Sequence, residues 1–114
     1  MGSDITVAFD KNDEGFSYVD ILPDNGAAFS WVDELAREME ERFGYKITDR
    51  IEGPDGTGIC DIEIGEKLIR FLFDEGWGIE IHPHDKGAEL DVIEMGVYLK
   101  EVLGKQGNDG TPEV

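Results

Sequence analysis

Short runs in which apolar and polar residues alternate recur along this chain, and such a period of two is typical of half-buried β-strands. Two of these runs, 5–9 and 17–21, flank the segment Asp10–Gly15 (DKNDEG), whose composition is that of a turn. The N-terminal region therefore predicts a β-hairpin. The alternating positions are Ile5, Val7 and Phe9 in the first run and Ser17, Val19 and Ile21 in the second.

A helical period follows the turn predicted at Pro23–Gly26 (PDNG). Apolar residues now recur every three or four positions, which places them on one face of an α-helix. The helix is expected to end at Gly44. It begins either at a capping box formed by Ser30 and Asp33 or earlier, near Asn25. The predicted apolar face consists of Val32, Leu35, Ala36, Met39 and Phe43.

Runs with period two return after the helix, at 45–51, 59–64, 67–73 and 77–82, and turns rich in Gly and Asp separate them. They predict an antiparallel meander. The last run places Trp77 on the same face as two isoleucines, which favours a core position for it. A final helix, about Lys86–Leu103, is expected to end at Gly104. Its apolar side consists of Val92, Met95, Leu99 and Leu103.

This order of elements predicts an α+β fold: an antiparallel sheet, made of the N-terminal hairpin and a three- or four-stranded meander, with two helices packed on one face. Residues 1–103 form a single domain, and residues 104–114 form a flexible polar tail. On the other face we expect Glu63 and Glu80 to flank Arg70. Leu68 and Leu72 share that face, which predicts that the N-terminal hairpin, a second subunit or a partner covers part of it.

The charge balance narrows the function. The chain has 27 acidic against 10 basic residues, for a net charge of −17. Such a surface repels nucleic acid and anionic membranes and attracts cationic partners. With 39% hydrophobic residues the chain can still bury a core, unlike a disordered acidic tail.

Cysteine content and targeting signals indicate the compartment. Cys60 is the only cysteine, so no intramolecular disulfide can form. The N-terminal residues lack the basic and apolar regions of a secretory signal, and no apolar segment approaches the length of a membrane span. We therefore expect a cytoplasmic protein.

Two motifs suggest metal binding. His82 and His84, with Asp85 beside them, resemble part of a zinc or nickel site, but Cys60 is the only cysteine and lies on another predicted strand. Asp10–Gly15 begins like a calcium loop, but Ile21 stands where the bidentate glutamate belongs. We interpret the histidines as a solvated strand-to-helix turn and the loop as a hairpin turn, and expect neither a metal nor a cofactor.

Catalytic signatures are weak. Cys60 lies in an apolar strand, where a thiol usually packs without reacting. Ser17 and Ser30 lack a recognisable base, and no phosphate-binding glycine motif occurs. We expect no enzymatic activity and assign no catalytic residues.

The acid itself is the strongest functional signal. Acidic clusters recur through every region, and aromatic residues near them supply the type of anchor that dominates binding energy. The aromatic candidates are Tyr18, Trp31, Tyr45, Trp77 and Tyr98. The predicted partner-binding residues are Asp74, Glu75, Trp77, Glu80, Glu34, Glu38 and Glu41.

A small acidic α+β chain without catalytic motifs resembles the immunity proteins of bacterial polymorphic-toxin and contact-dependent inhibition systems. The segment Gly76–Pro83 (GWGIEIHP) is similar to the Gly-Trp and alternating-strand pattern of some of these families. The resemblance implies neutralisation of a cationic toxin domain, often a nuclease, by occlusion.

Two other interpretations stay open. In one, the chain is a small acidic adaptor or housekeeping domain whose acidity serves solubility or salt adaptation. In the other, it is a small enzyme or metal protein that uses His82 and His84. The free sheet face also allows a homodimer.

Overall fold

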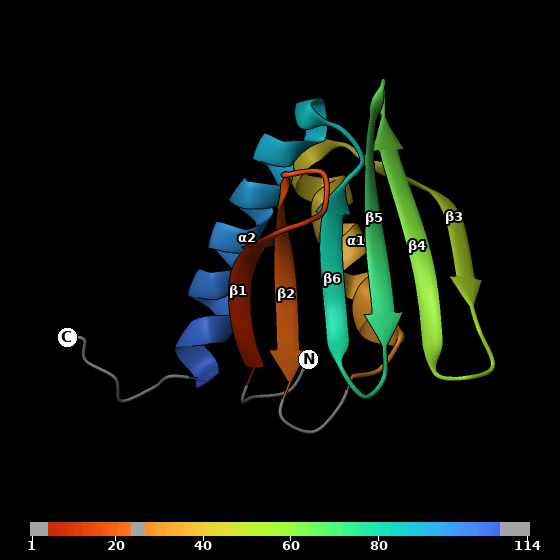
Figure 1. Cartoon of the computed structure of the whole chain (residues 1–114), viewed down its shortest axis with the longest axis vertical. Coiled ribbons are helices and arrows are strands. Elements are labelled where there is room, and N and C mark those ends of the chain that lie inside the picture. Colours follow the sequence, from red (N-terminus) through yellow and green to blue (C-terminus); the bar gives the residue numbers. More distant parts are fainter. Residues whose placement is uncertain (1–4, 24–26, 108–114) are drawn as a thin grey trace.

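The structure is a computed structural model that describes residues 5–23 and 27–107. It has an α+β fold with an antiparallel sheet of six strands, in the order β1-β2-β6-β5-β4-β3, and two helices (Figure 1). The turn predicted at Pro23–Gly26 and the end of the predicted tail fall largely outside these residues. The elements are β1 (Ile5–Lys11), β2 (Ser17–Pro23), α1 (Ser30–Phe43), β3 (Lys46–Glu52), β4 (Thr57–Ile64), β5 (Lys67–Asp74), β6 (Gly78–Pro83) and α2 (Lys86–Gly107).

The hairpin and the meander form one continuous sheet. The meander has four strands, and its last strand, β6, pairs with β2 of the hairpin. The hairpin therefore widens the sheet and does not cover its face, so that part of the prediction was wrong. Because β2 and β6 are far apart in the sequence, alternation within each strand contained no information about this pairing.

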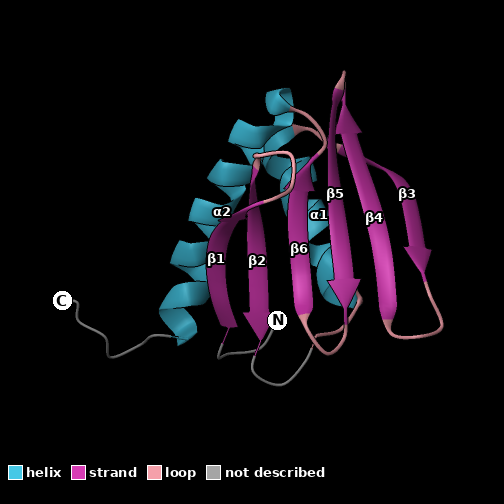
Figure 2. Ribbon diagram, viewed as in Figure 1, coloured by secondary structure: helices cyan, strands magenta, loops and turns pink. Residues whose placement is uncertain are grey.

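Both helices pack on the same side of the sheet, as predicted. In Figure 2 they lie behind the strands, and the front of the sheet is not covered by either helix. α2 contacts β1, β2, β6 and β5, while α1 lies against the meander half. Between the two layers lies the core, which contains the predicted apolar faces of both helices and the inward positions of the strands.

The first helix has the predicted C-terminus but a different N-terminus. Gly44 adopts a left-handed conformation with φ of 81°, and its N–H donates to the Glu40 carbonyl. At the other end Phe29 is the N-cap, with no side-chain cap bond. The predicted capping box does not form, because Ser30 is already helical and Asp33 binds Arg50 of β3 at 2.7 and 2.9 Å.

The second helix begins at Lys86 as predicted but ends at Gly107 rather than at Leu103. The first residues of the predicted tail are thus helical, since Gly104 does not end this helix. Among the apolar residues of α2, Val92 and Met95 are completely buried, and Leu99 and Leu103 are nearly so. This face of α2 closes the core over the hairpin half of the sheet.

Candidate functional site

The sheet face opposite the helices, here called the open face, is the best candidate for a functional surface. Alternation assigns side chains to it: in β5, Ile69, Phe71 and Phe73 are buried toward the helices, so the residues between them point the other way. Strand register then aligns the outward residues into rows across the sheet. The outward positions include Tyr18, Asp20, Ile51, Ile59, Asp61, Leu68, Arg70, Leu72, Glu80 and His82.

One row changes from apolar to acidic along its length. Ile51 of β3 pairs with Ile59 of β4, which pairs with Leu72 of β5, and we call these three residues the apolar strip. Leu72 then pairs with Glu80 of β6, and Glu80 pairs with Asp20 of β2. We call Glu80 and Asp20 the acid pair. An apolar contact surface therefore leads directly to two adjacent carboxylates.

Two shallow grooves follow the apolar strip. One, of about 330 Å³, is lined by Ile51, Ile59 and Leu72 among others. The other, of about 300 Å³, is lined by Leu72, Trp77 and Glu80 among others. Leu72 belongs to both, so the grooves lead from the edge strand β3 to Glu80, one member of the acid pair. Concave apolar surface of this kind favours the docking of side chains from a partner.

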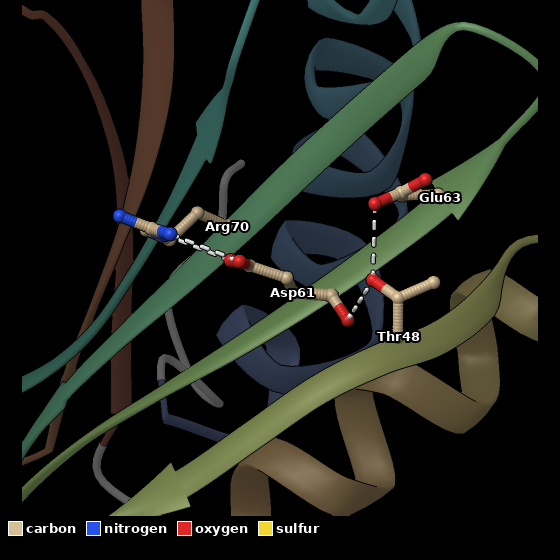
Figure 3. Close-up of polar contacts among 4 residues, drawn as sticks. All are labelled: Thr48, Asp61, Glu63 and Arg70. Carbon is tan, nitrogen blue, oxygen red and sulfur yellow. Dashed lines mark hydrogen bonds and ion pairs between the residues drawn. The ribbon is translucent and has the colours of Figure 1, made fainter.

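The neighbouring row contains an ion pair. Arg70 donates two hydrogen bonds to Asp61, at 2.8 and 2.9 Å, and Thr48 bridges to Glu63 and to the Asp61 carbonyl (Figure 3). The prediction that Glu63 and Glu80 flank Arg70 was wrong. In the actual register Asp61 lies directly opposite Arg70, and Glu63 lies opposite Leu68. A shift of two residues keeps a side chain on the same face but changes its partner.

His82 connects the β1–β2 turn to the acid pair. Its ring stacks on Tyr18 with 4.1 Å between the centroids. Asn12 Nδ2 lies 3.5 Å from His82 Nδ1, and His82 Nε2 lies 2.8 Å from Glu80 Oε1. Since the side-chain oxygen of Asn12, Oδ1, accepts two backbone N–H groups, the side-chain nitrogen Nδ2 is the donor toward His82 Nδ1. His82 then carries its proton on Nε2 and donates it to Glu80.

Asp20 is the unusual member of the acid pair. It is only 9% exposed, and its Oδ1 has no hydrogen-bond partner in the described part of the chain. Burial, followed by the negative charges of Glu80 and Asp10, raises the pKa of Asp20, while His82 opposes the shift. A buried carboxyl oxygen that has no partner among the described residues and lies opposite a second acid is unfavourable for the fold, and such groups are concentrated at functional sites.

The predicted partner-binding residues fall on two surfaces. Glu80 lies on the open face, and Asp74 and Trp77 line the groove beside it. Glu75 lies exposed in the same β5–β6 turn. The predicted residues of α1, by contrast, lie in the helix layer, away from the open face (Figure 1). These are Glu34, Glu38 and Glu41.

The aromatic candidates separate in the same way. Trp77 is 60% exposed, so the core position favoured by its alternation was wrong: it precedes β6 in a turn and is not part of the strand. Tyr45 is fully buried and donates to Asp91 at 2.8 Å. Trp31 and Tyr98 are partly buried in the helix layer. Trp77 is thus the aromatic candidate best placed to contact a partner.

The histidines do not form the suspected metal site. Within the described ranges, no three His, Cys, Asp or Glu side chains are grouped so that they could hold a metal ion. His82 is engaged by Tyr18 and Glu80, and His84 lies beyond β6, where its N–H donates to the Leu68 carbonyl. The predicted turn at Asp10–Gly15 lies between β1 and β2, but its first two residues, Asp10 and Lys11, belong to β1, and the turn itself begins at Asn12.

Cys60 is free and buried on β4, as expected for a packing residue. Burial is the main factor that raises the pKa of its thiol to about 11. At about pH 8 only about one thiol in a thousand would be ionised, even if reagent could reach it. We expect a disulfide reagent such as DTNB to leave Cys60 unmodified in the native protein and to titrate one thiol after denaturation. Rapid modification of the native protein would contradict this.

Sequence reasoning missed Asp20 and the apolar strip. Asp20 carries a weak signal, since it is a lone acid between Val19 and Ile21 and beside Leu22. The two isoleucines of the strip come from neighbouring strands and meet only through their register.

None of the described helices is long and apolar enough to cross a membrane. Comparison of the chain with protein-family models, with curated proteins and with solved structures gives no match.

Proposed function

We propose that this protein is a non-catalytic binding protein that neutralises a cationic toxin domain by covering it with the open face. The single observation that carries the proposal is the row in which the apolar strip leads to the acid pair. Stable protein interfaces combine an apolar centre with charges that select the partner. Among toxin domains, a nuclease is a natural target, since its substrate groove is cationic.

The charge of the whole chain supports a basic partner. At −17, the chain attracts cationic proteins over a distance and raises the rate of encounter at low salt. The apolar strip and Trp77 would then supply short-range binding energy. A second copy of this chain is a poorer occupant of the open face, because two surfaces of the same strong charge repel each other.

One observation favours a different function. Acidic residues are also numerous in the helix layer, where Glu34, Glu38 and Glu41 lie far from the apolar strip. A charge spread over both sides of the molecule is what solubility or salt adaptation requires. The alternative proposal is therefore a small acidic adaptor or housekeeping domain whose acidity is not specific for a partner.

A growth assay tests the first proposal. The C-terminal domain of the neighbouring gene product is induced in a bacterial host, with and without this protein. Relief of toxicity by this protein is the expected result. If the neighbouring domain is harmless, or its toxicity is not relieved, the adaptor function becomes the better explanation.

Trp77 provides a sharper test once a toxin domain is found. Because its side chain is 60% exposed, Trp77→Ala should change the melting temperature little. It should weaken affinity for the toxin domain about tenfold, as truncation of an aromatic anchor does. Isothermal calorimetry measures the affinity. Leu90→Ala is the matched control, since Leu90 is 69% exposed on α2. If both variants lost the same affinity for the toxin domain, Trp77 would not be an anchor of the interface.

Salt dependence of the melting temperature separates the two proposals. Screening relieves self-repulsion, so the melting temperature should rise with KCl up to about 0.5 M, where the Debye length has fallen to about 4 Å. A binding protein adapted to ordinary salt should show little further gain. A steep rise that continues toward molar KCl would favour salt adaptation.

A further inference from the structure

We infer that the acid pair is a receptor for one lysine or arginine side chain of a protein partner. The inference rests on the proposed function in one respect, namely that the partner is cationic. It goes further than the proposed function in two ways. It assigns recognition of the partner's positive charge to two particular carboxylates, Glu80 and Asp20, and it names the group that they bind.

The first argument is the state of Asp20. The residue is only 9% exposed, and Oδ1 has no hydrogen-bond partner within the described ranges. The ion pairs recorded between described residues do not include Asp20. Carboxylates in such a position normally accept hydrogen bonds. The free acceptor therefore lacks a donor that a bound partner would supply.

The second argument is the placement of Glu80 directly opposite Asp20. Side chains that face each other across antiparallel strands are within reach of one ligand, and like charges there oppose the pairing. A single ammonium or guanidinium group would bridge both carboxylates and remove the repulsion. The groups with negative charge near Asp20 are Glu80 and Asp10, so the local field also favours a cation.

The third argument is the way in which Glu80 is held. His82 donates to one carboxylate oxygen, Oε1, at 2.8 Å, and is itself fixed by the stacked Tyr18 and by Asn12. Among the described residues, the recorded hydrogen bond engages only Oε1, so the other carboxylate oxygen of Glu80 can accept a further donor. In contrast, Asp61 already has both oxygens bound by Arg70 on the same face. The acid pair is thus prepared for an incoming donor, and the Asp61 carboxylate is not.

The surroundings fit a long basic side chain better than a free ion. Leu72 lies opposite Glu80 and Ala8 lies opposite Asp20, so apolar surface borders the acid pair on both sides. Lysine and arginine lay their methylene stems along such surface and present the charge at the end. A calcium ion would need more oxygen ligands than these two residues provide.

An NMR titration of the full chain tests the inference. The probes are N-acetyl-lysine amide and N-acetyl-arginine amide, in which the side chain carries the only charge, with N-acetyl-norleucine amide as the uncharged comparison. With either basic probe we expect saturable chemical-shift changes in the backbone amide signals near the acid pair. These are the signals of Tyr18, Asp20, Glu80 and His82. The uncharged norleucine probe should cause none. The two basic probes also show which side chain is preferred.

Two double variants give the control. Asp20→Asn with Glu80→Gln should weaken binding of the basic probe at least tenfold. Glu94→Gln with Glu101→Gln removes the same charge from exposed positions of α2 and should change it less than twofold. Each variant's own spectrum reports whether it is folded. Equal weakening by both double variants, shifts centred elsewhere, or tighter binding of calcium than of either probe at the acid pair would overturn the inference.

The proposed function is tested separately by a polylysine peptide at low salt. Binding of polylysine without localisation at the acid pair overturns only the receptor inference, and the proposal of a cationic partner stands. Failure of polylysine to bind at all would overturn both.

Discussion

Replacing Gly78 with alanine is expected to lower the free energy of unfolding by about 4 kcal/mol, the combined cost of backbone strain and of a steric overlap. Gly78 begins β6 with φ of 134°, a region that residues with a side chain rarely adopt. A Cβ atom there would overlap the carbonyl oxygen of Ile21. Neither strand can move away easily, because β2 and β6 join the hairpin to the meander. Urea denaturation followed by tryptophan fluorescence measures the loss.

Gly65→Ala is the matched control for this prediction. Gly65 also has a positive φ, of 58°, but a Cβ atom would meet nothing within 4 Å. Only backbone strain remains there, so the expected loss is about 1 kcal/mol. If both variants lost the same free energy, the close approach of β2 and β6 at Gly78 would not be a determinant of stability.

Asp20→Asn is expected to have the opposite effect and to stabilise the protein by about 2 kcal/mol at neutral pH. It replaces a buried carboxylate, whose Oδ1 has no partner among the described residues, with a neutral group. The same substitution is part of the double variant expected to lose binding of a basic probe. A residue whose replacement stabilises the fold and weakens binding is typical of a functional site. Asp13→Asn, in the exposed β1–β2 turn, removes the same charge and should change stability little.

The stabilisation by Asp20→Asn should depend on pH. Because the pKa of Asp20 is raised above 3.8 in the native state, the native protein holds this proton more tightly than the unfolded chain does. Below 3.8 both states are protonated and the variant has little advantage. As pH rises through the native pKa, Asp20 loses its proton and its contribution to stability, so the variant's advantage grows and then levels off. After burial, the negative charges of Glu80 and Asp10 add to the rise in this pKa, and His82 opposes it. A constant advantage from acidic to neutral pH would show that ionisation of Asp20 is not responsible.

Much of the architecture was predictable because its signals are local. Period-two runs predicted the strands, and the helical period predicted the buried faces that contain Leu35 and Met39 in α1 and Val92 and Met95 in α2. Gly44 also ended α1 as expected, through a conformation that glycine adopts readily. Periods of this kind depend only on where a side chain points from its own element.

The candidate site was less predictable, and the errors have a common cause. Glu80 and Trp77 were identified, but Asp20 was not, and Glu63 was expected where Asp61 lies. The expected core position of Trp77 assumed that the strand began one residue earlier than it does. Each error concerns which residue lies opposite another across the sheet, or where a strand begins. None concerns the alternation of side chains within a strand.

By itself, the sequence determined the α+β class, the inward face of each element and the strongly acidic character of the surface. Only the tertiary structure decided that β2 lies beside β6, that Arg70 binds Asp61, and that Asp20 is buried opposite Glu80, with no partner for its Oδ1 in the described part of the chain. The physical reason is that alternation gives a side chain its face but not its neighbour. Strand order and register bring distant residues together, and they depend on the packing of the whole chain.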